Sequence, residues 1–454
     1  MSPLIHIEPT MPTCRLVTLG CKVNQYETQT VREALYNHGF REARDNENAH
    51  LCFVNTCTVT GQGDAKSRQL IRRLARSNPG TRIIVTGCYA TRDPDAIRTL
   101  PGVTEVVTDK RELPDVLERF GITDLPKGIR FFDGRHRAFV KVQDGCLLDC
   151  SFCIIPQVRP RVTSRPVDDI LHEVQQLVQN GYREIVLTGI HLGHFGVDLS
   201  RGKPRKLWCR LWHLLERLCT CPIPIPWRIR LSSLEATEVT DDFIKVLRDY
   251  TSICPHLHLS LQSGSDRILT AMRRRYRIGT YLKKVDQINQ IMDRPAMTTD
   301  IIVGFPGESE NDFQQTCHVV KQIGFSKTHL FPFSPRRGTD AALLKDQIPK
   351  PIKTERMRRL QQIEIATSSQ YFQSLLGTTL EVLVEQESPL KRQLGRRESE
   401  PEANAGPKQA LLRGTACRYA PVQFVGETGT LGQIQKVRVS KLVNGTLMGT
   451  LTHR

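Results

Sequence analysis

No stretch of this chain approaches the run of about 18 uncharged apolar residues that a membrane-spanning helix needs. The first residues, MSPLIHIEPTMPTC, also lack the basic segment followed by an apolar segment that marks a secretory signal. We therefore expect a soluble, cytoplasmic protein with no membrane partner. Internal repeats of fixed period and coiled-coil heptads are absent too, which excludes a solenoid and a long coiled coil.

Acidic residues are outnumbered by basic ones. The chain has 47 Asp and Glu against 64 Lys and Arg, a formal net charge of +17. This balance favours a polyanionic partner, most often nucleic acid, although a basic protein without such a partner stays an alternative. The 454 residues are enough for about three domains, which excludes a peptide or a single small module.

Cysteine is not scarce, and there are 14 in a chain without a secretory signal. The cytosol keeps thiols reduced, so this count argues against a disulfide scaffold and favours metal or cluster ligation by some of them. Eight cysteines stand apart from any ligand pattern and are expected to be structural: Cys14, Cys52, Cys209, Cys219, Cys221, Cys254, Cys317 and Cys417.

Residues 13–120 are expected to form an α/β domain. The apolar runs CRLVTLG, LCFVNTC and RIIVTGC are typical of buried parallel strands, and helical periodicity follows the first two of them. Each of the three strands ends at a cysteine: Cys21, Cys57 and Cys88. Ligands of open α/β sheets bind at the carboxyl ends of the strands, so the fold is expected to gather these thiols, unless they are core cysteines by chance.

Residues 132–368 again alternate strands with helices, which predicts a parallel sheet, either open or partly closed into a barrel. The segment DGCLLDCSFCIIP places Cys146, Cys150 and Cys153 just after the first strand, spaced CxxxCxxC. Three thiolates on a four-iron cluster leave one iron open to a substrate. A zinc site would normally need a fourth ligand nearby, and the next histidine is His172.

The last part of the chain, residues 371–452, has short β patterns separated by glycines, as in a small β-barrel. Within it, the highly charged segment 388–409 is expected to be a disordered insertion between two strands. In the central region, Trp208, Trp212, Leu214 and Leu215 are expected to form the buried stripe of a helix.

The CxxxCxxC spacing, Phe152 and the preceding strand resemble the radical S-adenosylmethionine (SAM) enzymes. In that family the open iron binds SAM, and an electron from the cluster cleaves it to a 5′-deoxyadenosyl radical. By this resemblance four residues at strand ends bind SAM: Gly189, Ser232, Glu235 and Gly304. Tight turns and a helix cap would explain the same four residues without a ligand. We assign no catalytic role to the nearby His191 and His194.

Around the first three cysteines, TLGCKVNQYET, NTCTVT and VTGCYA resemble the N-terminal domain of the methylthiotransferases. The resemblance extends from Thr13 to Thr452. It implies a second, auxiliary 4Fe-4S cluster on Cys21, Cys57 and Cys88, and a C-terminal RNA-binding barrel similar to a TRAM domain, in which Arg418 departs from the expected polar residue. The implied fold is an N-terminal α/β domain, a central partial (β/α) barrel and a small C-terminal β-barrel.

Lys22, Val23 and Gln25, with neighbouring motifs, look most like the branch that adds a methylthio group to threonylcarbamoyladenosine at position 37 of tRNA. Branches acting on isopentenyladenosine or on a ribosomal protein stay open, as does a non-enzymatic iron-sulfur protein that binds RNA. The implied partners are the tRNA anticodon loop and an electron donor. Two basic runs, at residues 201–206 and 273–277, either contact phosphates or are solvated loops.

Overall fold

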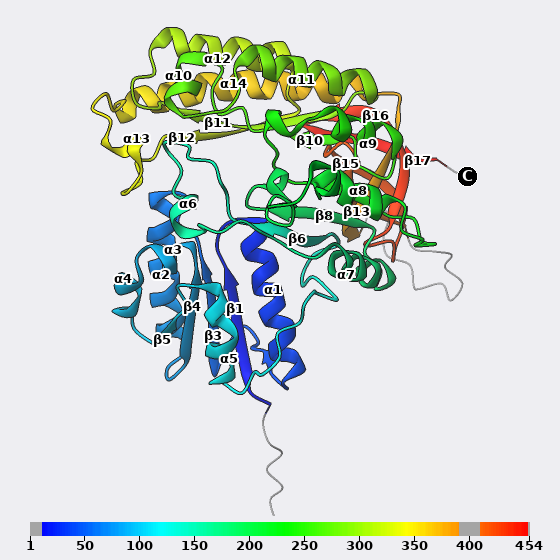
Figure 1. The fold of residues 1–454 in the computed structure, drawn as a ribbon. Coiled ribbons are helices and arrows are strands. Elements are labelled where there is room, and N and C mark those ends of the chain that lie inside the picture. Colours follow the sequence, from blue (N-terminus) through cyan, green and yellow to red (C-terminus); the bar gives the residue numbers. More distant parts are fainter. Residues whose placement is uncertain (1–10, 390–408, 453–454) are drawn as a thin grey trace, which may run out of the picture. The chain divides into compact units, whose positions relative to one another are not determined.

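The computed structural model describes residues 11–389 and 409–452 (Figure 1). The chain divides into two compact units. The first contains the chain up to Ile129, together with two later segments, Asp144–Thr163 and Ser334–Ala342. The second contains Arg130–Gln143, Ser164–Phe333 and the chain from Leu343 onward.

The first unit is built on a five-stranded parallel sheet with the order β2-β1-β3-β4-β5. Its strands are β1 (Thr13–Thr18), β2 (Arg41–Glu42), β3 (Leu51–Thr56), β4 (Arg82–Gly87) and β5 (Val103–Val106). Every side chain of β3 is buried, as expected for a central strand that is covered on both faces.

Helices cover both faces of this sheet. On one face Val31, Ala34 and Leu35 of α1 pack with Phe53 and Ile84. On the other face Leu70, Ile71 and Leu74 of α2 pack with the alternate strand residues, among them Val54 and Val85. The helices of this unit are α1 (Lys22–Asn37), α2 (Gly61–Ser77), α3 (Cys88–Arg92), α4 (Pro94–Arg98), α5 (Leu113–Glu118) and α6 (Ile155–Val158).

The second unit contains a partial barrel of parallel strands. One sheet has the order β7-β6-β8-β9 and another has the order β10-β11-β12. Single bridges between Ile229 and Ile253 and between Leu234 and Leu259 connect them. The strands are β6 (Ala138–Asp144), β7 (Thr163–Ser164), β8 (Glu184–Gly189), β9 (Arg228–Leu231), β10 (His256–His258), β11 (Ala296–Val303) and β12 (Lys327–Pro332).

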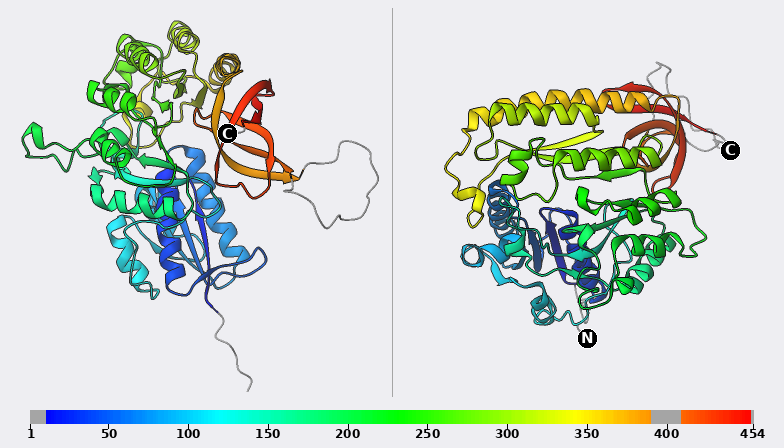
Figure 2. Two further views of the ribbon diagram at one scale, coloured as in Figure 1. Left: turned by 90° about the vertical axis from the view of Figure 1, so that its right-hand side faces the viewer. Right: turned by 45° about the horizontal axis from the view of Figure 1, so that its top comes forward.

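Helices alternate with these strands, and Figures 1 and 2 show α11, α12 and α14 lying along β11 and β12. The helices are α7 (Val167–Gln179), α8 (Leu211–Cys219), α9 (Asp241–Asp249), α10 (Asp266–Ala271), α11 (Ile278–Ile291), α12 (Glu310–Ile323) and α14 (Lys350–Ser374). The short helix α13 (Asp340–Leu343) lies mostly in the first unit. Leu214 and Leu215 are buried in α8 as predicted, whereas Trp212 is only partly buried. The prediction was wrong for Trp208, which precedes α8 and is 39% exposed, because its ring lies under the Arg210 guanidinium and not in the core.

The C-terminal strands form a closed barrel with the order β13-β14-β15-β17-β16. They are β13 (Thr379–Pro389), β14 (Gln409–Ala416), β15 (Pro421–Glu427), β16 (Ile434–Val443) and β17 (Thr446–Leu451). Alternate apolar side chains such as Val382, Leu412, Phe424 and Val437 fill its core. Most of the predicted insertion at 388–409 lies outside the described residues.

The predicted fold class is confirmed: the chain has an N-terminal α/β layer, a central parallel barrel with its helices, and a small C-terminal β-barrel. Within the described part of the chain, no helix combines the length and apolar character needed to cross a membrane.

Candidate iron-sulfur and S-adenosylmethionine sites

The first cysteine triplet lies at the carboxyl ends of three neighbouring strands. Thr56 at the end of β3 is paired with Gly87 at the end of β4, so Cys57 and Cys88 occupy adjacent positions directly after them. Cys21 follows β1, on the other side of β3. The sheet register therefore brings the three strand ends together as predicted.

Close backbone packing supports this cluster of thiols. Gly20 has φ +99°, and a Cβ there would lie 3.0 Å from the Cys57 sulfur. A side chain at Gly20 would therefore displace the Cys57 thiol. Asn24, in the first turn of α1, donates from Nδ2 to the carbonyls of Leu19 and Thr56 at 2.9 and 3.0 Å, which fixes the Cys21 turn against the end of β3.

Burial and the neighbouring thiols set the electrostatic environment of the first triplet. Burial, with a smaller contribution from the nearby Cys88 and Cys21 thiols, raises the pKa of Cys57 to about 11. Charge repulsion among thiolates disappears when iron binds, because each metal-thiolate bond replaces a proton. Cys21 is exposed while Cys88 is buried, so one donor of the triplet lies at the surface and another lies in the interior. Three cysteines that follow neighbouring strand ends are a donor set that fits a four-iron cluster.

The second triplet lies on the loop that joins β6 to α6. Cys153 donates its backbone N–H to the carbonyl of Cys150 at 2.9 Å, and Leu148 donates its N–H to the Cys146 sulfur at 3.4 Å. An N–H directed at sulfur stabilises the thiolate form, as a cluster ligand requires. This loop also fits a four-iron cluster with three protein ligands.

The base of this loop closes tightly. Gly145 has φ +75°, and a Cβ there would overlap the carbonyl oxygen of Arg161. The segment after β12 adds further support, because Ala341 donates its N–H to the Ser151 carbonyl at 2.8 Å and Gln157 donates to the Gly338 carbonyl. Two segments far apart in sequence therefore shape the loop.

Gly189 ends β8, and its missing side chain has a structural use. A Cβ there would lie 2.7 Å from Gln143 Oε1, which accepts the His191 N–H at 2.9 Å. His191 in turn contacts Glu238, which accepts the Glu235 N–H at 2.9 Å. These contacts connect the turn after β8 to the turn after β9. The predicted residues Gly189 and Glu235 therefore lie at the two ends of one chain of contacts.

Ser232 and Glu235 follow β9. The Ser232 hydroxyl is buried and has no hydrogen-bond partner within residues 11–389 and 409–452. A buried unpaired hydroxyl at a strand end suits a polar ligand. Glu235 is buried and forms an ion pair with Arg274 at 3.0 Å. Arg274 belongs to the second predicted basic run, so that run is only partly exposed.

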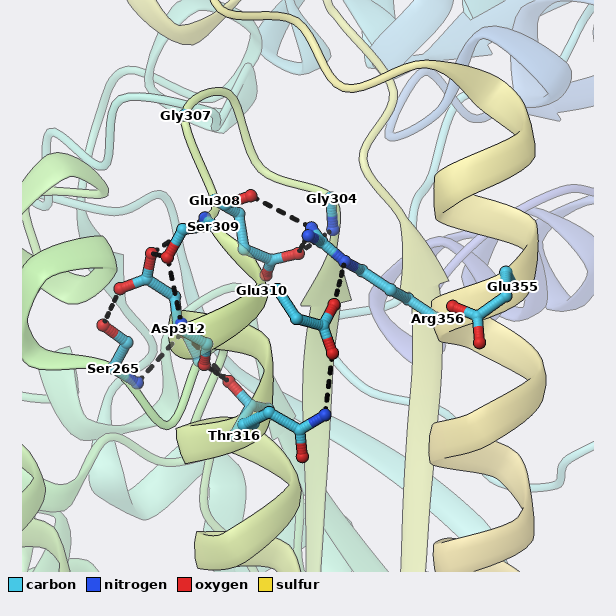
Figure 3. Close-up of polar contacts among 12 residues, drawn as sticks. Ser265, Gly304, Gly307, Glu308, Ser309, Glu310, Asp312, Thr316, Glu355 and Arg356 are labelled. Carbon is cyan, nitrogen blue, oxygen red and sulfur yellow. Dashed lines mark hydrogen bonds and ion pairs between the residues drawn. The ribbon is translucent and has the colours of Figure 1, made fainter.

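Gly304 follows β11 with φ +73°, where a Cβ would overlap the Lys353 side chain of α14. The Glu308 carboxylate accepts the Gly304 N–H at 2.9 Å and an N–H of Arg356 at 2.7 Å. Figure 3 shows these contacts. Burial raises the pKa of Glu308, while Arg356 favours its charged form. The Gly304 turn is therefore held by α14.

Two groups of potential metal ligands lie in the second unit; sequence reasoning noted His191 and His194 of the first group without Glu238, and it missed the second group. His191, His194 and Glu238 form one, with the two histidine rings 4.0 Å apart. His258, Asp300 and His329, on β10, β11 and β12, form the other, with 3.2 Å between His258 Nε2 and Asp300. The members of each group come from segments far apart in the sequence, and no common motif links them.

Family comparisons agree with this architecture. A model of the uncharacterized protein family UPF0004 matches residues 13–109, and a model of the radical SAM superfamily matches residues 140–320. The threonylcarbamoyladenosine tRNA methylthiotransferase MtaB of Bacillus subtilis (strain 168) is 36% identical over 448 residues, which cover 95% of this chain and 94% of the relative. The chain belongs to the radical SAM methylthiotransferase family.

Other members of the radical SAM methylthiotransferase family match at similar levels. MtaB of Chlamydia pneumoniae is 40% identical over 376 residues, covering 82% of this chain and 87% of the relative. The tRNA-2-methylthio-N(6)-dimethylallyladenosine synthase of Mycobacterium sp. (strain MCS) is 33% identical over 475 residues, covering 98% and 89%. This methylthiotransferase is thus an enzyme that uses SAM and a 4Fe-4S cluster.

Among solved structures, the radical SAM methyltransferase TsrM of Kitasatospora setae, with cobalamin and a 4Fe-4S cluster bound, resembles this methylthiotransferase with a TM-score of 0.52. The two are 14% identical, and the match covers 73% of this chain and 77% of that one. This similarity concerns the fold alone. The residue limits of the three domains and the ten assigned site residues stay predictions.

Proposed function

We propose that this enzyme adds a methylthio group to C2 of N6-threonylcarbamoyladenosine at position 37 of tRNA, as the name of its Bacillus subtilis relative describes. The observation that carries the proposal is the presence of two separate cysteine triplets, each shaped by the fold, in a chain that matches this relative over 95% of its length. Transfer of an intact sulfur group to an unactivated carbon needs both a radical source and a sulfur site.

In this proposal Cys146, Cys150 and Cys153 hold the radical cluster, and Gly189, Ser232, Glu235 and Gly304 bind SAM. Once bound and reduced by an external electron donor, the cluster and SAM supply a radical that removes the C2 hydrogen. The Leu148 N–H stabilises the Cys146 thiolate, and the unpaired Ser232 hydroxyl is available to the cofactor.

The first triplet, Cys21, Cys57 and Cys88, holds a second 4Fe-4S cluster in this proposal. Its three strand ends provide three sulfur donors, so a four-iron cluster held there would keep one iron open to the sulfur that the enzyme transfers. Cys21 is exposed, so the open side of this site is accessible to a substrate.

The tRNA contact is proposed for the C-terminal barrel and the exposed basic run at residues 201–206. On β16, Lys436 and Arg438 alternate with the buried Val437 and Val439, so both cations lie on the outer face, and exposed Lys441 follows them. Lys and Arg provide the phosphate contacts on which most RNA affinity depends. Arg418 instead donates to Asp293 and Arg294 within the protein.

The test offers the reconstituted enzyme two tRNAs under anaerobic reducing conditions, one carrying threonylcarbamoyladenosine and one carrying dimethylallyladenosine. We expect methylthiolated nucleoside only from the first, because buried polar groups complementary to a threonylcarbamoyl group stay unpaired against a prenyl group. Such a mismatch discriminates by about ten-thousandfold. Nucleoside mass spectrometry measures the product.

A Cys150→Ala variant is the control for enzyme-dependent product. Product from the prenylated tRNA alone would assign the chain to the branch of the mycobacterial relative, which matches over 98% of the chain. Product from neither tRNA would favour the ribosomal-protein branch. Absence of any cleavage of SAM would favour a non-enzymatic protein.

A further inference from the structure

Arg159 is a buried arginine at the end of α6, six residues after the last cysteine of the radical loop. Its side chain is 3% exposed. A guanidinium taken out of water at this depth needs a partner for each donor, because an unpaired buried charge is costly. The partners of Arg159 belong to both cysteine sites.

On the side of the radical loop, Arg159 pairs with Asp144, the residue at which this loop begins. Nη1 donates to both Asp144 oxygens, at 2.7 and 2.9 Å. Asp144 precedes Gly145, whose backbone lies against the Arg161 carbonyl. The ion pair therefore closes the base of the loop that carries Cys146, Cys150 and Cys153.

Toward the first triplet, Arg159 reaches a cysteine directly. Nε donates to the Cys88 sulfur at 3.4 Å, and Nη2 donates to Asn24 Oδ1 at 2.7 Å. The same Asn24 oxygen lies 3.7 Å from the Cys21 sulfur, which donates to it. Ile154 and Val158 of the same segment pack on Cys88. One side chain thus joins two of the three cysteines of this triplet to the radical loop.

The positive charges of Arg159 and Lys110 face the negative charges of Glu27 and Asp144. Glu27 accepts from Arg159 at 3.1 and 3.2 Å and also contacts Lys110, which lies 3.9 Å from Asp144. Two cations therefore face two carboxylates. Loss of Arg159 would leave an excess of negative charge beside Cys88 and Cys21.

We propose that Arg159 is a positioning residue that couples the two cysteine sites: it closes the radical loop through Asp144 and, through its hydrogen bond to Cys88, raises the reduction potential of the cluster on the first triplet. A donor or positive charge beside a cluster thiolate stabilises the more negative reduced state, so the potential rises. This inference rests on the second cluster of the proposed function.

The first experiment uses the full chain with Cys146, Cys150 and Cys153 replaced by Ala, so that only the first triplet can bind iron. An electron paramagnetic resonance titration then compares this background with added Arg159→Gln or Arg159→Lys. We expect Arg159→Gln to lower the reduced-to-oxidised ratio at the reference midpoint about tenfold, equivalent to a potential about 59 mV lower. Arg159→Lys keeps the charge but not the hydrogen-bonding fork, so a smaller decrease is expected.

Arg32→Gln is the matched control, since Arg32 is a 14% exposed arginine of the same unit that pairs with Glu42 and donates to Gln29. It should leave the potential unchanged. Absence of any four-iron cluster in the cysteine-substituted background would overturn the second cluster itself. A cluster that forms with the same potential in both Arg159 variants would overturn the role of Arg159 alone.

The second experiment tests loop closure with Cys21, Cys57 and Cys88 replaced by Ala, which leaves only the radical loop. Adding Arg159→Gln should make release of iron to a chelator several-fold faster, because the Asp144 pair no longer closes the loop. An unchanged release rate would contradict this part of the proposal.

Discussion

Glu184 is a fully buried carboxylate surrounded by arginines. It pairs with Arg230 at 2.7 Å, with Arg228 at 2.6 Å and with Arg137 at 3.5 Å. Burial alone would raise the pKa of Glu184, but the Arg230 and Arg228 charges hold it well below its usual range. The arginines also donate to carbonyls of the C-terminal barrel, for example Arg228 to Glu381 and Arg230 to Cys417. One carboxylate therefore supports the attachment of that barrel.

At this residue scale we expect Glu184→Gln to lower the free energy of unfolding by about 3 kcal/mol, because it leaves buried arginines without their counter-ion. Urea denaturation followed by circular dichroism measures the change. Asp168→Asn is the control, since its pair with Arg217 is exposed and worth at most about 1 kcal/mol. Equal effects of the two substitutions would contradict the argument.

At the scale of the element, α12 begins at an elaborate N-terminal cap. Asp312 accepts from the Ser309 N–H at 2.8 Å and from the Ser265 hydroxyl at 2.6 Å (Figure 3). It also pairs with Arg267. Ser309 in turn accepts the Asp312 N–H at 3.2 Å, which completes a capping box. The cap fixes the loop from Gly304 to Ser309 that precedes this helix.

Asp312→Asn should destabilise the protein by about 1 kcal/mol at neutral pH. Burial tends to raise the pKa of Asp312, but hydrogen bonds from Arg267, Ser265 and Ser309 hold it well below the ordinary value of about 3.9. The charged form therefore stabilises the fold above that ordinary pKa, and the contribution is lost as the pH falls below it.

The difference in urea midpoint between the parent protein and Asp312→Asn should accordingly shrink between pH 5 and about pH 3. Asp242→Asn, an exposed position in the first turn of α9, serves as the control and should show a small difference at every pH. A difference for Asp312→Asn that grows on acidification would refute the sign.

At the scale of the whole molecule, the basic residues behind the net charge of +17 have two different environments. Arg159, Arg228, Arg230 and Arg274 are buried in ion pairs, whereas Lys436, Arg438 and Lys441 face outward from β16. Only exposed cations can release counterions from RNA, so the count of basic residues overstates the binding surface.

Replacing Lys436, Arg438 and Lys441 with Ala should weaken tRNA binding and reduce the slope of log affinity against log salt by about 2, at about 0.7 per lost phosphate contact. Filter binding at several salt concentrations measures the slope. The control removes three exposed cations from α2: Lys66, Arg72 and Arg73. A similar loss in both variants would show that overall charge, and not the barrel, determines the affinity.

The sequence by itself determined the alternation of strands and helices and the cysteine spacings on which the two proposed cluster sites rest. Strands such as LCFVNTC are buried on both faces, so their apolar runs are continuous, and CxxxCxxC is a local spacing that one loop can present to one cluster. The parallel order of β1, β3 and β4 then placed Cys21, Cys57 and Cys88 at one edge. These features depend on periods and intervals of a few residues.

Only the tertiary structure decided which distant side chains meet. Arg159 lies 71 residues from Cys88 and 135 from Asn24, and Arg228 lies 187 from Thr415. Nothing in the local pattern distinguishes these arginines from solvated ones such as Arg275, because burial of a charge is settled by the partners that packing supplies. The same reason explains why Trp208 was misplaced: its alternative partner, Arg210, provides a stacking contact outside the core.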